Sequence, residues 1–126
     1  MLLDTHAFLW WIADDPRLSP RAAALIADGA NEVHVSAASA WEVVVKSALG
    51  RVEVPKPVDR FVTAQLVANA FVPLPIQMRH ALGLSALPEI HRDPFDRILV
   101  AQAVAEDLTL VSGDRALGGY PVAIEW

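Results

Sequence analysis

Residues 1–13 read MLLDTHAFLWWIA, and this stretch decides the interpretation of the fold. Its short apolar segment 1–3 is typical of a strand, Asp4 ends that strand, and residues 5–13 predict a helix. The same alternation continues along the chain, with predicted strands at 33–36, 71–74, 108–111 and 122–124 and predicted helices at 20–28, 39–49, 58–69, 76–84 and 94–106. Strands that alternate with helices predict an α/β fold in which a mostly parallel sheet of about four to five strands is flanked by helices on both faces, as a three-layer sandwich.

The composition is that of one globular domain over residues 1–126. The chain is 54% hydrophobic and 20% charged, which excludes a disordered or low-complexity protein. Cysteine is absent, which excludes a disulfide framework, a thiolate metal site and a cysteine nucleophile. The longest apolar run, residues 7–13, is far shorter than the ~20 residues of a membrane span. Because Asp4 and His6 also interrupt the start of the chain where a signal peptide would be apolar, we expect a cytoplasmic protein.

The charge balance is acidic. Fifteen acidic residues against ten basic ones give a net charge of −5 and a pI near 5.2. This balance argues against broad electrostatic binding to nucleic acid, which needs a basic face. What matters is therefore whether the acids are spread over the surface or gathered at one place.

Several acids have local structural explanations. Asp4 and Asp93 fit helix N-caps, and Pro94 and Asp96 then occupy the first and third helical positions. Asp114 fits a cap for the turn that follows it.

The segment around Glu42 has a local explanation of the same kind. Residues 39–42 fit a capping box that begins at Ser39. Glu42 also stands four residues before Lys46, the spacing of an exposed ion pair on a helix. Each of these acids can therefore be explained singly by its helix.

Taken together, the acids point to a common site. In a parallel sheet the helix N-termini gather at the carboxyl edge of the strands, which brings Asp4, Glu42, Asp96 and Asp114 toward one edge. Carboxylates that gather repel one another and raise one another's pKa, and a divalent cation removes that repulsion. Oxygen ligands without cysteine favour Mg²⁺ or Mn²⁺.

Four motifs carry a resemblance to a known family. They are LLDTHAFLWW at 2–11, SAASAWEVVVKSALGR at 36–51, HRDPFDRILVAQA at 91–103 and LVSGD at 110–114. Together they resemble the PIN-domain ribonucleases, in particular the VapC toxins of bacterial toxin–antitoxin pairs. The motifs follow in the expected order over nearly the whole chain, and the third is the most specific. The resemblance implies a single PIN domain over 1–126 with a PIN-like sandwich.

The resemblance also implies roles for individual residues. The four acids Asp4, Glu42, Asp96 and Asp114 match the catalytic acids of the family. It implies that Asp4, Asp96 and Asp114 hold Mg²⁺, with Mn²⁺ as the alternative, while Glu42 binds a second metal or orients the attacking water. Asp93 and Ser112 are further candidates, and we prefer Asp93 as the helix cap. Ala116 stands where some relatives carry a further acid, so a complete second metal site is not implied.

The implied activity is Mg²⁺-dependent hydrolysis of RNA phosphodiester bonds by the toxin of a toxin–antitoxin pair. Attack by water gives products with 5′-phosphate and 3′-hydroxyl ends. The implied partners are a VapB-like antitoxin, an RNA such as tRNA or rRNA, and a second copy of the chain. Four basic residues flank the acid motifs and are candidates for phosphate contacts: Arg92, Arg97, Arg115 and Lys46. Trp10, Trp11 and Trp41 are more than one buried stripe accommodates, and the helix predicted at 5–13 is apolar around most of its circumference, so we expect another chain to cover part of that helix.

Other functions remain open from the residues alone. His6 and His91 lie beside two of the acids and would suit a metal-independent acid–base nuclease, which leaves cyclic phosphate ends. A dehalogenase-type phosphatase needs a second acid two residues after Asp4, where this chain has His6, and the acid and lysine pattern of a receiver domain is missing. The second class is a catalytically silent or non-toxin PIN-fold module that binds RNA.

Overall fold

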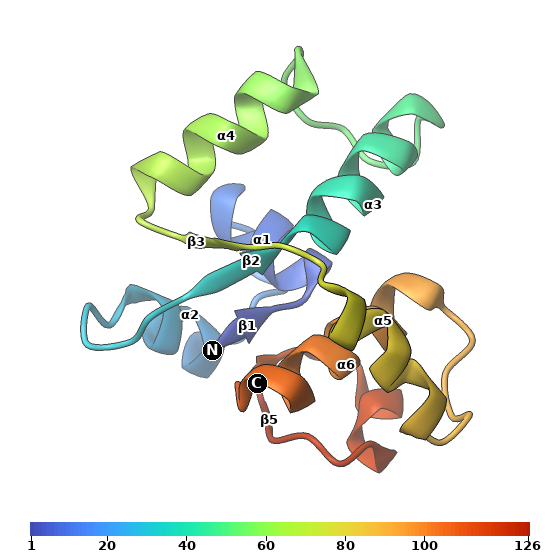
Figure 1. The fold of residues 1–126 in the computed structure, drawn as a ribbon. Helices are drawn as coiled ribbons and strands as arrows, with labels where there is room; N and C mark the ends of the chain where they lie inside the picture. Colours follow the sequence, from blue (N-terminus) through green and yellow to red (C-terminus); the bar gives the residue numbers. More distant parts are fainter.

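The computed structural model describes residues 1–126 and is built on a five-stranded sheet (Figure 1). The strands are β1 (Leu2–Leu3), β2 (His34–Ser36), β3 (Val72–Leu74), β4 (Leu110–Val111) and β5 (Ile124–Glu125). Their order in the sheet is β3-β2-β1-β4-β5, and every neighbouring pair is parallel. From β1 the chain extends the sheet to one side and then returns to the other side at β4. The direction of strand addition therefore switches between β1 and β4.

Helices cover both faces of this sheet (Figure 1). They are α1 (Thr5–Ile12), α2 (Pro20–Ala27), α3 (Ala37–Ala48), α4 (Val58–Ala68), α5 (Met78–Gly83) and α6 (Pro94–Glu106), with 3-10 turns η1 (Leu84–Ala86) and η2 (Arg115–Gly119). The first four helices pack mainly on one face, and α5 and α6 pack on the other. None of them combines the length and apolar character required to span a bilayer. The α/β prediction with a parallel sheet between two helical layers is confirmed.

The hydrophobic core divides into two clusters because neighbouring strand residues face opposite sides. Leu3 and Val111 pack with Phe8 of α1 in one cluster. Leu2 and Leu110 pack with α6 in the other. All four strand residues are completely buried, as expected for central strands covered on both faces.

The start of α3 differs from the sequence prediction. Ser36, not Ser39, is the N-cap, and its hydroxyl oxygen accepts a hydrogen bond from the backbone N–H of Ala38 at 2.9 Å. The Ser36 hydroxyl also donates to the side-chain oxygen of the buried Gln102 on α6. This contact between distant segments fixes the helix start three residues earlier than the capping-box pattern predicted, so that prediction is wrong. Ser39 is instead buried within α3 and accepts a hydrogen bond from Thr5 at 3.0 Å.

We expect Ser36→Ala to lower the free energy of unfolding by about 1–2 kcal/mol or more. The variant removes a helix cap and leaves the buried Gln102 oxygen without a donor. Chemical denaturation with circular dichroism measures the change. Ser85→Ala is the matched control, because the Ser85 hydroxyl is exposed and bonds only its own turn. Equal stability of the two variants would contradict the role of Ser36.

Candidate active site

The site lies at the carboxyl edge of the sheet, between β1 and β4, where the order of strand addition switches. A ligand site is expected there in an open α/β sheet. Asp4 follows β1 directly, and its backbone N–H donates to the carbonyl oxygen of Val111 in β4 at 3.0 Å. Ser112 follows β4 directly, and Asp114 caps η2 two residues later. The sheet hydrogen bonds thus bring two of the predicted acids to neighbouring strand ends.

Asp4 is buried, with 5% of its surface exposed. Its Oδ1 caps α1 by accepting a hydrogen bond from the backbone N–H of Ala7 at 2.7 Å. Burial raises the pKa of Asp4 above its ordinary value, while hydrogen bonds from Ser112 and Ala7 act in the opposite direction. Ser112 is itself buried, so its predicted place in the site is as a partner of Asp4.

Glu42 lies in the second turn of α3 and is also buried, at 3% exposed. Its Oε2 accepts a hydrogen bond from Lys46 one turn later, so the predicted ion pair forms. The pair is buried on the Glu42 side, not exposed as the spacing suggested. Glu42 Oε1 is buried without any hydrogen-bond partner. A buried carboxylate oxygen in this state is unfavourable unless a ligand completes it.

The start of α6 supplies two acids with different surroundings. Asp93 is the N-cap, as predicted, and its Oδ1 accepts from the backbone N–H of Phe95 at 2.8 Å and of Asp96 at 3.3 Å. Asp96 is partly buried, and its pKa is raised to about 7. Burial is the largest cause, followed by the negative charge of Asp93 and, more weakly, the charges of Glu42 and Asp4. The pKa of Asp96 is therefore raised first by burial and second by the negative charges around it, while His91 lowers it.

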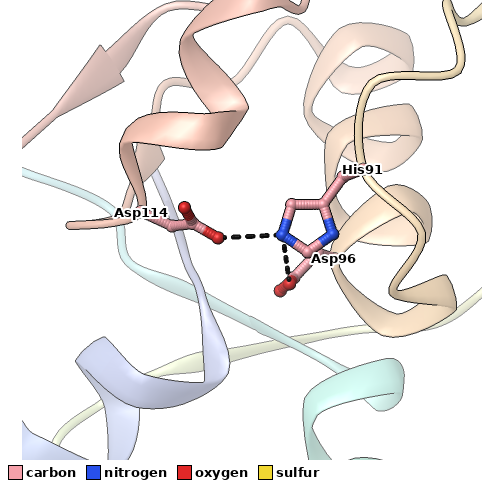
Figure 2. Close-up of side chains that lie close together, drawn as sticks. All are labelled: His91, Asp96 and Asp114. Carbon is pink, nitrogen blue, oxygen red and sulfur yellow. Dashed lines mark hydrogen bonds and ion pairs between the residues drawn. The ribbon is translucent and has the colours of Figure 1, made fainter.

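His91 connects Asp96 to Asp114 (Figure 2). Its Nε2 lies 3.0 Å from Oδ2 of Asp114 and 3.5 Å from Oδ2 of Asp96. Since the backbone N–H of Asp93 donates to His91 Nδ1 at 3.1 Å, a neutral ring carries its proton on Nε2 and donates it to Asp114. One ligand atom from each of His91, Asp96 and Asp114 lies within 4.8 Å of the others. The sequence analysis treats His91 only as a candidate acid–base group and does not predict that it lies between Asp96 and Asp114.

The donor set suits a hard divalent cation. Asp96 and Asp114 are directly brought together, and Asp4 and Glu42 lie close enough for their charges to raise the pKa of Asp96. Carboxylate oxygens with an unpartnered buried member at Glu42 are the ligands that Mg²⁺ and Mn²⁺ prefer. The residues present therefore fit a divalent cation on the chemistry of their side chains.

The four basic candidates divide into two pairs. Arg92 and Arg115 are exposed and form no ion pair. Lys46 is engaged with Glu42, and the Nη2 of Arg97 donates to the carbonyl oxygen of Leu84 at 3.4 Å while its buried Nε has no partner. The spacing of these residues in the sequence does not distinguish the two pairs, because whether a side chain is free to contact phosphate depends on its burial in the fold.

The tryptophans also divide by exposure. Trp10 and Trp11 pack partly against the core, and the Trp11 indole N–H donates to Asn69 at 2.9 Å. Trp41 is 59% exposed, with its ring edge-on to Phe95 at a centroid distance of 4.8 Å. The part of the aromatic surface that remains uncovered is thus on α3.

Comparisons with known proteins agree with this architecture. The model of the PIN domain family matches residues 1–121. Ribonuclease VapC22 from Mycobacterium tuberculosis is 33% identical over 121 residues, which covers 95% of this chain and 91% of that protein. The solved structure of VapBC2 from Rickettsia felis, bound to a DNA fragment from their promoter, aligns with a TM-score of 0.73 at 15% identity and covers 99% of this chain and 97% of that one. A toxin–antitoxin complex from Klebsiella pneumoniae aligns with a TM-score of 0.61 at 16% identity, over 99% and 95% of the two chains.

The raised pKa of Asp96 has a consequence for stability in metal-free protein. Between pH 4 and about pH 7 the folded chain holds a proton on Asp96 that the unfolded chain has released, since the ordinary pKa is 3.8. The free energy of unfolding in EDTA is therefore expected to fall as the pH rises through this window and to level off above it. Asp96→Asn removes this loss, and we expect the variant to be more stable than wild type by about 2 kcal/mol at pH 8.

Thermal or urea unfolding at pH 5 and pH 8 measures the effect. Asp59→Asn is the matched control, because Asp59 is exposed and forms no ion pair in the first turn of α4. Its replacement removes a favourable helix-dipole contact and is expected to be neutral or slightly destabilising. A destabilised Asp96→Asn variant at pH 8 would contradict the raised pKa of Asp96.

Proposed function

The chain belongs to the PIN domain family, and from this premise we propose that it is a VapC-like toxin that hydrolyses RNA phosphodiester bonds with a divalent cation. The observation that carries the proposal is the set of carboxyl groups gathered at the switch between β1 and β4, where the pKa of Asp96 stands at about 7. The ribonuclease name of the relative from Mycobacterium tuberculosis supports RNA as the substrate class.

In this proposal Asp4, Asp96 and Asp114 hold Mg²⁺, with Mn²⁺ as the alternative. Glu42 offers its unpartnered Oε1 to a second cation or to the attacking water. When bound, a divalent cation lowers the pKa of water and neutralises charge on the phosphoryl oxygens. Asp93 acts as the helix cap, and the buried Ser112 accepts a hydrogen bond from the backbone N–H of Asp114 at 3.1 Å and lowers the pKa of Asp4.

The surroundings of two acids favour a preorganised site. Lys46 holds Oε2 of Glu42 and leaves Oε1 available. The backbone N–H of Ala116 donates to Oδ1 of Asp114 at 2.9 Å, so Oδ2 faces His91 and Asp96. In each carboxylate, one oxygen is held by a hydrogen bond and the other faces the proposed site. This preorganisation lowers the free energy needed to orient the two side chains during the reaction.

The choice of substrate and partners follows from charge and exposed surface. A net charge of −5 leaves little basic surface, which favours a selective enzyme acting on a structured RNA such as tRNA or rRNA over indiscriminate binding. Arg92 and Arg115 are the exposed candidates for phosphate contacts, while Arg97 and Lys46 are candidates only if their present contacts open.

We also propose a VapB-like antitoxin as partner, a homodimer, and a cytoplasmic location. The fold shared with a solved toxin–antitoxin complex supports the antitoxin. Trp41 is 59% exposed and Val44, one helical turn later on α3, is 49% exposed, which supports burial of this surface by another chain.

Asp4→Asn and Asp96→Asn are expected to retain the fold and to lose RNA cleavage by about 10²-fold or more, because each removes charge from the site that stabilises the transition state. Cleavage of total cellular RNA in Mg²⁺ measures the rate, and circular dichroism checks the fold. Asp59→Asn, an exposed acid distant in sequence from the site motifs, is expected to cleave at the wild-type rate. Folded Asp4→Asn and Asp96→Asn proteins with wild-type rates would sink the assignment.

Removal of divalent cations is expected to abolish cleavage. RNA cut in Mg²⁺ is expected to carry 5′-phosphate and 3′-hydroxyl ends, because water attacks in place of the ribose 2′-hydroxyl. Sequencing of the RNA ends with and without EDTA measures both properties. Cleavage in EDTA with cyclic phosphate ends would favour the acid–base nuclease at His6 or His91. RNA binding without cleavage under any condition would favour the silent binding module.

A further inference from the structure

A pocket with aromatic walls lies directly beside the acids, and the proposed hydrolysis does not use those walls. Its volume is about 460 Å³, and Asp4 and Asp114 form part of its lining. The other principal side chains are His6 and Trp10 of α1, Arg17 from the segment after α1, and Trp126 after β5. Together His6, Trp10, Arg17 and Trp126 form what we term the aromatic pocket.

The side chains of the aromatic pocket contact one another. The Trp10 ring centroid lies 5.5 Å from that of His6 and 5.8 Å from that of Trp126, both in tilted geometry. The Arg17 guanidinium carbon lies 5.0 Å from the Trp10 ring centroid, within cation–π range. Trp10 and Trp126 both pack partly against the core, so they form fixed walls, whereas His6 one turn before Trp10 is exposed. The pocket therefore has two rigid aromatic sides.

The position of Trp126 follows from the sheet. Glu125 is paired with Val111 in the parallel β4–β5 ladder, so the next residue on each strand reaches the same edge. This brings Trp126 beside the segment 112–114. A Cβ at Gly113 would lie 2.6 Å from Cε2 of the Trp126 ring, so the indole can lie against this segment only because position 113 has no side chain.

Arg17 is oriented before any ligand binds. Its Nε and Nη2 donate to the two carboxylate oxygens of Asp15, with Nη2 to Oδ2 at 2.7 Å, while its guanidinium lies over Trp10. The side chain is nevertheless 68% exposed, so its remaining N–H groups can reach a ligand. A guanidinium held in this way loses less conformational entropy when it contacts a phosphate.

We propose that the aromatic pocket binds the nucleoside of the RNA that lies next to the cleaved phosphodiester, with its unpaired base against Trp126, His6 and the Trp10 wall. Arg17 contacts the adjoining phosphate. The inference rests on the proposed ribonuclease function and adds the subsite that orients the strand. Unpaired bases stack on aromatic side chains in proteins that bind single-stranded RNA, and their sequence tolerance comes from the π-face that every base has.

Three observations favour RNA as the occupant of this pocket. The pocket shares Asp4 and Asp114 with the proposed catalytic site, so its occupant lies beside the reacting phosphate. A net charge of −5 limits the affinity that phosphate contacts can supply, and stacking adds affinity that does not depend on charge. The volume of about 460 Å³ is also within the range of pockets that hold small ligands.

The test compares two probes in EDTA, where cleavage is not expected. One is a labelled RNA hexamer of adenosines, and the other is the same hexamer without its bases. The dissociation constant of the base-free hexamer divided by that of the adenosine hexamer gives the contribution of the bases, because the phosphates are common to both. Stacking of one base predicts that Trp126→Ala lowers the wild-type ratio by about 5- to 100-fold, and that Trp126→Phe retains most of it. Fluorescence anisotropy measures the binding.

Two further variants locate the effect. Met78→Ala is the control, because Met78 is an exposed apolar residue on α5 outside the pocket, and its ratio is expected to equal that of wild type. Arg17→Ala is expected to weaken both hexamers by a similar factor, since the phosphate is present in each. An effect of Arg17→Ala on the base-containing hexamer alone would overturn the phosphate contact.

The outcomes separate this inference from the proposed function. A ratio unchanged by Trp126→Ala, or lowered equally by Met78→Ala, overturns the subsite even if wild type cleaves RNA. A ratio that depends on Trp126 in a protein that cleaves no RNA supports the subsite and overturns the nuclease. If Trp126→Ala changes only the oligomeric state of the protein in solution and not its RNA binding, a second copy of the chain covers the pocket and the RNA subsite is overturned.

Discussion

The burial of several carboxyl groups close together, beside the ends of β1 and β4, is the constraint on which the rest of the structure depends. The groups come from four segments far apart in the sequence, and burial together with neighbouring charge holds the pKa of Asp96 at about 7. A fold selected for stability alone has no reason to bring such groups together, because their ionisation near neutral pH opposes folding. The arrangement becomes favourable when a divalent cation is present, which is why the acid cluster supports a metal-dependent function.

The rest of the fold serves to hold these acids in place. The strands have only two or three residues each, so the sheet is little more than a frame that aligns helix N-termini at one edge. Asp4, Asp93 and Asp114 accept backbone N–H groups at the start of α1, α6 and η2, and Lys46 holds Glu42. The apolar clusters on both faces anchor the helices that supply these contacts. Because Asp4 and Asp114 each cap a helix through Oδ1, a capping role leaves Oδ2 of each available to the proposed catalytic site.

Much of this could be predicted from the sequence, because the signals are local. Strand and helix alternation predicted the parallel sheet, and Asp4 and Asp93 were predicted as caps from the residues beside them. The start of α3 was not predicted, because Ser36 and Ser39 both fit a cap and the contact of Ser36 with Gln102 on a distant helix decides between them. The position of Trp126 was missed for a similar reason, since the last strand was expected at 122–124 and forms at Ile124–Glu125. The positions of His91 beside the acids and of Arg17 in the pocket depend on the strand order and on loop conformation. Neither produces a local pattern in the sequence that could have predicted them.

Titration of Mn²⁺ into the metal-free protein shows whether these carboxylates bind a divalent cation, and the loss of the electron paramagnetic resonance signal of free Mn²⁺ measures the binding. If the gathered carboxylates form a cation site, wild type binds Mn²⁺ and Asp96→Asn binds it at least about tenfold more weakly. Asp59→Asn, which changes the net charge equally but outside the cluster, retains the wild-type affinity. Equal binding by wild type and Asp96→Asn, or no binding by wild type, would contradict the account.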